Sequence, residues 1–148
     1  MEAGIVRGGT IEEVKSKKFN IYAGISLGNK WFTKENIKSY ILWGLKHTKN
    51  RFGIVIADTL QIVNYKVLEH MSEQASTRKA LREGDKFIAL INEILKELPE
   101  DKKNLVDIIR WEDLKKDQFY KIAYPIFLYK FKEDDLFRKE IKLRDKYY

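Results

Sequence analysis

Short apolar segments alternate with longer amphipathic ones along the whole chain, and this alternation restricts the fold more than any other feature. The run FGIVIAD is apolar at consecutive positions, as in strands covered on both faces, whereas the intervening segments show helical spacing. The predicted strands are residues 17–25, 52–58 and 104–111; the predicted helices are 33–50, 67–98 with a bend at Gly84, and 113 onward with a kink or break at Pro125. Strand and helix in this order favour right-handed crossovers. We therefore predict an α/β fold, a Rossmann-like parallel sheet with helices on both faces.

Length and composition indicate one domain over residues 1–148, because no linker, repeat or low-complexity segment divides the chain. Cysteine is absent and the only histidines are His47 and His70, so disulfides, thiolate catalysis and the usual zinc spacings are excluded. We expect no metal and no other cofactor. No apolar run approaches the roughly 20 residues that cross a bilayer, and the first residues lack a signal-peptide core, which predicts a cytoplasmic protein without a membrane partner.

The charge balance is basic, with 29 lysines and arginines against 22 acidic residues and a net charge of +7. The excess lies in the first third of the chain and near its end, where it would favour a polyanion such as RNA. A solvated lysine-rich surface explains the same composition equally well.

The loop GISLGN follows the first predicted strand, at the edge of a parallel sheet where ligands usually bind. Gly24 and Gly28 flank Ser26 and would allow a backbone or ligand to approach closely. The spacing matches neither the dinucleotide fingerprint, nor a Walker A loop, nor G-x-S-x-G. The local pattern therefore leaves two interpretations of Ser26 open: a structural turn residue or a functional serine.

Taken with the segments that follow it, this loop resembles the tRNA-dependent cyclodipeptide synthases, in order along the chain. That family has a Gly-Ile-Ser-x-x-Asn-x-x-Phe turn, a tryptophan in the next helix, a second strand ending in Asp-Thr and a later helix with an Ala…Lys-Ala-x-x-x-Gly pattern. These features fall on Gly24, Ile25, Ser26, Asn29, Phe32, Trp43, Asp58, Thr59, Ala75, Lys79, Ala80 and Gly84. The segment WEDLKKDQFYKIAYPIFLYKFKEDDLFRKEI also resembles the family, so the similarity covers nearly the whole chain.

The resemblance implies a fold like the catalytic domain of class I tyrosyl- and tryptophanyl-tRNA synthetases, and a reaction in which two aminoacyl-tRNAs yield a cyclic dipeptide. Ser26 would accept the first aminoacyl group as the nucleophile. Gly24, Asn29 and Asp58 would line the substrate site, although Asn29 could equally stabilise its own turn and Asp58 could merely cap the next segment. A basic set on the later helix would contact tRNA, namely Arg78, Lys79, Arg82 and Lys86.

The chain departs from the family in its length, because members are usually longer and carry a catalytic Tyr-x-x-x-Glu pair in a C-terminal part beyond the similar region. Tyr129 and Glu133 have that spacing, on one helix face, although the alignment sets them against an earlier family segment. Two functions therefore stay open: an aminoacyltransferase that forms a cyclic dipeptide, or a catalytically incomplete relative that binds aminoacyl-tRNA or a protein. We also expect a homodimer or a partner subunit, contacted through apolar residues of the terminal stretch: Ile126, Phe127, Phe131, Leu136, Phe137 and Ile141.

Overall fold

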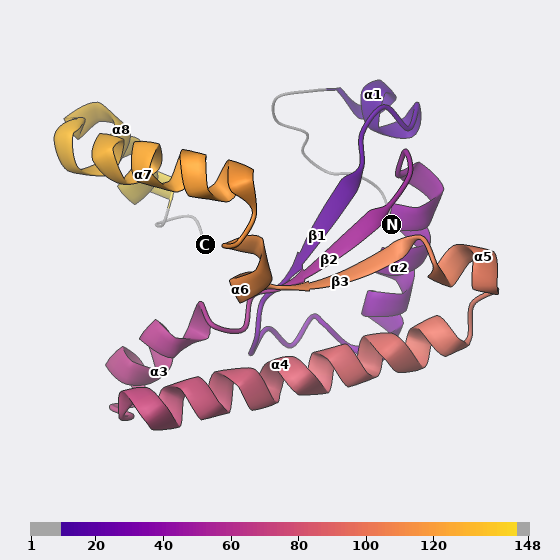
Figure 1. Ribbon diagram of the computed structural model, residues 1–148, viewed down its shortest axis with the longest axis horizontal. Coiled ribbons are helices and arrows are strands. Elements are labelled where there is room, and N and C mark those ends of the chain that lie inside the picture. The colour runs from indigo at the N-terminus through magenta and orange to yellow at the C-terminus, as the bar shows by residue number, and fades with distance from the viewer. Residues whose placement is uncertain (1–9, 145–148) are drawn as a thin grey trace. The chain divides into compact units, whose positions relative to one another are not determined.

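The computed structural model describes residues 10–144 and contains a three-stranded sheet (Figure 1). The strands are β1 (Ile21–Ile25), β2 (Phe52–Ile56) and β3 (Val106–Arg110), in the order β1-β2-β3, and both pairs are parallel. The helices are α1 (Ile11–Lys15), α2 (Lys34–His47), α3 (Gln61–Leu68), α4 (Glu73–Lys96), α5 (Glu100–Lys103), α6 (Trp111–Leu114), α7 (Gln118–Glu133) and α8 (Asp135–Arg144). The predicted Rossmann-like α/β class and its parallel sheet are confirmed.

The core lies between the sheet and helices α2 and α4. Apolar residues at helical spacing, such as Ile37 and Ile41 on α2 and Ile91 and Ile94 on α4, are buried against alternate residues of the strands. A Cβ at Gly44 would overlap the ring of Phe52, so the glycine sets how closely α2 approaches β2. Ala23 and Ile25 of β1 are buried in this core, whereas Tyr22 on the other face of that strand is exposed. Trp43 is half-buried and packs beside His47.

Most of the segment predicted as one helix over residues 67–98 is the single helix α4, but the predicted start is wrong, because residues 67 and 68 end the separate helix α3. His70 adopts a φ of 53°, which an α-helix does not allow, and Ser72 then caps α4 by accepting the Ala75 backbone N–H. At Gly84, where we expected a bend, α4 continues as a helix.

Of the two alternatives predicted at Pro125, the break is wrong, because α7 runs through this proline to Glu133, and the kink stays a prediction. The separation from α8 comes at Asp134, whose backbone is extended and whose carboxylate accepts the Phe137 backbone N–H. An N-cap of this kind starts a new helix. The boundary therefore lies at the cap and not at Pro125, although this proline lacks a backbone N–H to donate within α7.

The chain divides into two compact units, residues 1–111 and 112–148. The first holds the sheet with helices α1 to α5, and the second holds α7 and α8, which pack against each other. That both units form a single domain stays a prediction. Over the described range 10–144, no helix combines the length and apolarity needed to cross a membrane.

Candidate functional site

The turn between β1 and α2 carries Ser26 in an exposed position directly after the last residue of the strand. Leu27 next to it is buried, and Gly28 adopts a φ of 81°, a conformation that favours glycine. The Asn29 side chain accepts the Trp31 backbone N–H at 2.9 Å. This hydrogen bond supports the interpretation of Asn29 as a residue that stabilises its own turn. Ser26, in the same turn, is accessible to solvent.

Gly24 leaves open space beside this turn. A Cβ built on it would meet no atom of the described chain within 4 Å, and the residue is exposed. Packing within the described chain thus does not explain why a glycine stands here. The free space is consistent with the predicted approach of a substrate to the end of β1.

Asp58 lies at the same edge of the sheet and is completely buried, with 0% of its surface exposed. Its carboxylate accepts the Thr59 backbone N–H at 2.8 Å and pairs with the Arg110 guanidinium at 2.7 Å. Arg110 also forms an ion pair with Asp85 of α4. Asp58 is therefore held by a network that connects the ends of β2 and β3 to α4. Its hydrogen bond from the Thr59 backbone N–H supports the interpretation that Asp58 caps the following segment.

Gly84 completes this network from the side of α4. A Cβ at Gly84 would lie 2.8 Å from Oδ2 and 2.9 Å from Cβ of Asp58, closer than side chains pack. The glycine thus gives the buried carboxylate room beneath the helix. Sequence reasoning placed Gly84 in a family pattern but did not predict this contact.

Arg110 is the residue that sequence reasoning missed. The predicted third strand could have pointed to it, because Arg110 lies near the carboxyl end of that strand. Parallel strands bring their carboxyl ends to the same edge of the sheet, where ligands usually bind. The register pairs Ile25 with Ile56, and Ile56 with Arg110, so the turn with Ser26, the segment with Asp58 and Arg110 all leave the sheet on the same side.

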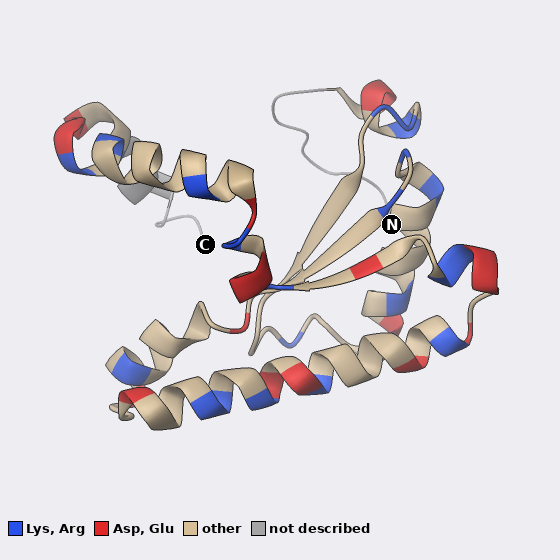
Figure 2. Ribbon diagram, viewed as in Figure 1, with Lys and Arg blue, Asp and Glu red and all other residues tan. Residues whose placement is uncertain are grey.

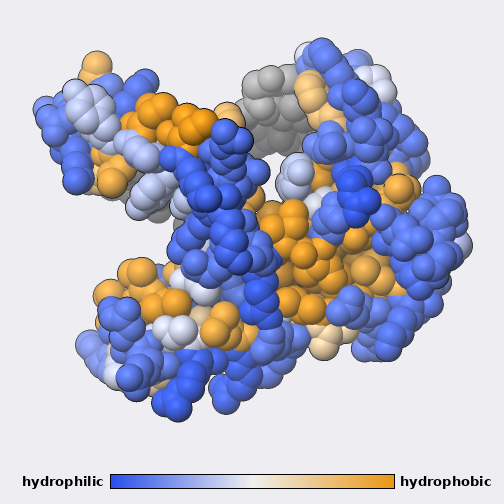
Figure 3. Space-filling view, viewed as in Figure 1, coloured by the Kyte–Doolittle hydropathy of each residue, from blue (hydrophilic) through white to orange (hydrophobic). Residues whose placement is uncertain are grey.

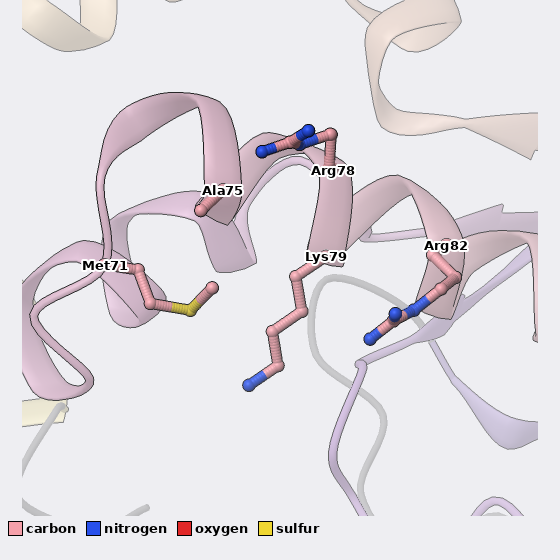
Figure 4. Close-up of a pocket in the computed structure, with 5 residues that line it drawn as sticks. All are labelled: Met71, Ala75, Arg78, Lys79 and Arg82. Atoms are coloured by element: carbon pink, nitrogen blue, oxygen red, sulfur yellow. The ribbon is translucent and has the colours of Figure 1, made fainter.

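The predicted tRNA-binding residues lie along α4, where basic and acidic side chains alternate (Figure 2). A hollow of about 460 Å³ is lined by Met71, Ala75, Arg78, Lys79 and Arg82 (Figure 4). In Figure 4 the side chains of Lys79 and Arg82 extend to the same side of the helix. The structure thus brings three of the four basic residues to one hollow, and Lys86 follows one turn later.

These four cations differ in how far they are neutralised. Lys79 pairs with Glu69 at 2.5 Å and lies 4.3 Å from the centre of the Tyr65 ring, and Arg82 and Lys86 contact Glu83. The hydrogen bond from Lys86 is the main reason why the pKa of Glu83 is lowered. Arg78 is exposed and forms no ion pair with any side chain in the described part of the chain, which leaves its charge available to a polyanion.

Tyr129 and Glu133 lie on α7 in the second unit and are both exposed. Their spacing places them one turn apart on one face of α7, as predicted. The second unit is not positioned relative to Ser26, so their catalytic role stays a prediction. Within residues 10–144, no three His, Asp or Glu side chains cluster as metal ligands would.

A family model described as "Cyclodipeptide synthase" matches residues 9–144. A search of curated proteins finds no match. Among solved structures, a cyclodipeptide synthase from Fluoribacter dumoffii superposes with a TM-score of 0.74 at 19% identity, over 93% of this chain and 60% of that one. A cyclodipeptide synthase from Bacillus thermoamylovorans gives 0.68 at 25% identity, over 86% of this chain and 53% of that one.

A Mycobacterium tuberculosis protein gives a TM-score of 0.72 at 21% identity, over 86% of this chain and 56% of that one. It is described as demonstrating that cyclodipeptide synthetases are related to type I tRNA synthetases, which accords with the predicted fold class. The chain thus spans between 53% and 60% of the length of these three structures.

Proposed function

Because the chain belongs to the cyclodipeptide synthase family, we propose that it uses aminoacyl-tRNAs as acyl donors and forms a cyclic dipeptide through an aminoacyl-enzyme on Ser26. The observation that carries this proposal is the position of Ser26: exposed, directly after β1, in a turn whose neighbour Gly24 leaves open space. The same edge of parallel sheets binds ligands in other α/β proteins.

The proposed chemistry needs no activation by ATP, because an aminoacyl ester is already activated. The Ser26 hydroxyl oxygen attacks the ester carbonyl carbon, the bond from that carbon to the ribose oxygen breaks, and the hydroxyl proton ends on that oxygen. The amino group of the second aminoacyl-tRNA then displaces Ser26 to form the first peptide bond. Attack by the remaining amino group on the second ester closes the ring and releases the second tRNA. Such steps depend mainly on positioning and on stabilising the oxyanion.

The proposed roles of the other residues follow from their places. Gly24 and Asn29 belong to the turn that would receive the aminoacyl group, and Asp58 would support the substrate site from beneath through its pair with Arg110. Arg78, Lys79, Arg82 and Lys86 would contact tRNA phosphates along α4. Tyr129 and Glu133 would handle protons if the second unit, or a second chain, brings them to Ser26.

A catalytically incomplete relative is the second candidate, favoured by the span of 53% to 60% of the three solved structures. Helix α7 supports a partner in either case, because none of its residues is buried and its large apolar side chains are exposed. Figure 3 shows such hydrophobic atoms on the surface of the part formed by α7 and α8. Ile126, Phe127, Phe131 and Leu136 of the predicted contact set are exposed and Phe137 is partly buried, whereas the side chain of Ile141 lies outside the described residues.

The test of the nucleophile is acyl transfer from charged tRNA. The protein should become labelled when incubated with tRNA carrying a radioactive aminoacyl group, and Ser26→Ala should not. Ser39→Ala, another exposed serine, is the matched control and should label like the wild type. A wild-type protein that stays unlabelled with all twenty charged tRNAs would remove Ser26 as nucleophile and leave the binding function.

Binding to tRNA is tested separately by its dependence on salt. Neutralising phosphates releases counterions, so the affinity should fall steeply as salt rises. The combined change of Arg78, Lys79, Arg82 and Lys86 to alanine should weaken binding and flatten that slope. Four basic residues of the first unit that lie neither on α4 nor in the lining of this hollow serve as the control set: Lys15, Lys18, Lys49 and Lys103. Equal losses for both sets would show that α4 provides no specific surface.

A further inference from the structure

A second hollow lies at the opposite edge of the sheet, where the crossover helices end and the strands begin. Its volume is about 400 Å³, which is within the range of ligand-binding pockets. Its lining comes from the ends of α2 and α4, from α5 and from the segment after α1: Lys17, Leu42, Leu45, Lys46, Leu98, Pro99 and Lys102. Because α2 ends just before β2 and α5 just before β3, this hollow faces away from the turn that carries Ser26.

The rim of this hollow is basic and not neutralised. Lys17, Lys46 and Lys102 are exposed, and none of them forms an ion pair with a carboxylate among residues 10–144. The local field is positive enough to affect a neighbour: the pKa of His47 is lowered, first by burial and then by the charges of Lys46, Lys15 and Lys17. By contrast, Lys79 and Lys86 on α4, and Lys115 and Lys116 just after α6, have acidic partners.

The floor of the hollow is aliphatic. Leu42 is 48% exposed although α2 offers an apolar stripe to the core, and Leu45 and Leu98 are partly buried beside it. Covering these leucines would remove apolar surface from water, which favours association. We propose that this hollow binds an acidic peptide segment of a partner protein, with one leucine-like side chain on the floor and flanking carboxylates paired with the three lysines.

The lining distinguishes a peptide from the other polyanions that a basic rim could attract. Single-stranded nucleic acids are held by aromatic or arginine side chains on which bases stack, and this lining has neither. A membrane surface is contacted by protruding apolar side chains, whereas these leucines line a concavity between lysines. An acidic segment with an apolar anchor matches both the charge of the rim and the aliphatic floor.

The proposal is tested with a fluorescein-labelled peptide of sequence EELLEELLEE and the full chain, by fluorescence anisotropy. Lys17→Ala, Lys46→Ala and Lys102→Ala combined should weaken binding about tenfold, since three rim charges acting together amount to about one power of ten in affinity. The control triple is Lys66→Ala, Lys79→Ala and Lys86→Ala, which removes the same charge from α3 and α4 of the same unit, outside the lining of the hollow, and should leave the affinity unchanged. None of these variants touches Ser26 or its turn.

The floor is tested with a matched pair of substitutions. Leu42→Glu should abolish binding, whereas Leu60→Glu, at a leucine that is 47% exposed away from the hollow, should not. Circular dichroism checks that both variants fold. The proposal is overturned if the peptide EEGSEEGSEE binds as tightly, if both lysine triples weaken binding equally, or if no binding is detected. It is also overturned if phosphatidylserine vesicles or unacylated tRNA bind more tightly with the same dependence on Lys17, Lys46 and Lys102. Loss of acyl transfer from Ser26 would leave the proposal intact, so the two functions fail separately.

Discussion

The substitution Arg110→Met should destabilise the first unit strongly, because it would leave the Asp58 carboxylate buried without its cation. Asp58 is 0% exposed, and after the change its carboxylate would keep the hydrogen bond from the Thr59 backbone N–H but lose its ion pair. Gly84 of α4 lies directly against the carboxylate and covers it on this side. The ionised group would thus lose a contact at 2.7 Å without regaining its hydration.

The size of the effect follows from the burial of the pair. Removing one partner of a buried ion pair costs about 3–5 kcal/mol. Arg110 keeps 27% of its side chain exposed and water reaches that end of the pair, so we expect the lower end, about 3 kcal/mol. With a urea dependence of about 2 kcal/mol per M, the unfolding midpoint should fall by about 1.5 M.

The assay is urea denaturation followed by circular dichroism, with two further variants. Arg51→Met breaks the exposed ion pair to Asp107, and its midpoint should change far less. Asp58→Asn combined with Arg110→Met should regain part of the loss, because the amide carries no charge and can still accept the Thr59 N–H. Equal midpoint shifts for Arg110→Met and Arg51→Met would refute the reasoning, as would a double variant no more stable than Arg110→Met.

Three other outcomes are expected. Gly84→Ala should lower the melting temperature although alanine favours helices by about 1 kcal/mol, because its Cβ would lie 2.8 Å from Oδ2 of Asp58; a higher melting temperature would contradict this. The pKa of His47 is lowered in the folded state, mainly by burial. Its contribution to stability is therefore present above the unfolded pKa of about 6.5 and is lost as the pH falls through the folded pKa. His47→Leu should make the urea midpoint fall less between about pH 7.5 and 5.5 than it does in the wild type. The protein should self-associate in light scattering through the exposed face of α7, and Phe127→Glu should shift it toward monomer; a monomer at every concentration would contradict self-association.

The arrangement of strands was predictable because it depends on patterns within short segments. The apolar runs placed all three strands, and the order of elements predicted their parallel pairing, which the structure confirms. The break between α3 and α4 was not predictable in this way, because residues on both sides of it favour helices. It depends on the backbone of one residue, His70, and on the cap formed by Ser72.

Contacts at the site were less predictable than its position. Sequence reasoning placed Ser26 after the first strand, where it lies, and made Asp58 the last residue of the second strand, whereas β2 ends two residues before it; the contacts of Asp58 were left open. Those contacts depend on Arg110, which is 52 residues away in the chain, and on the space left by Gly84. Lys79 illustrates the same limit, since its pair with Glu69 forms only because the chain turns at His70 between the two helices.

The network around Asp58 connects the two parts of the proposed site within the first unit. Arg110 joins the end of β3 to Asp58 after β2 and to Asp85 on α4, the helix that carries the basic residues. The turn with Ser26 leaves the neighbouring strand at the same edge, and Ala57 donates its backbone N–H to Ile25 at 3.0 Å. The position of the turn proposed to accept the acyl group and that of the helix proposed to bind tRNA are therefore set by one set of contacts. In this arrangement, a change at Arg110 should disturb the alignment of tRNA with Ser26 as well as the stability of the fold.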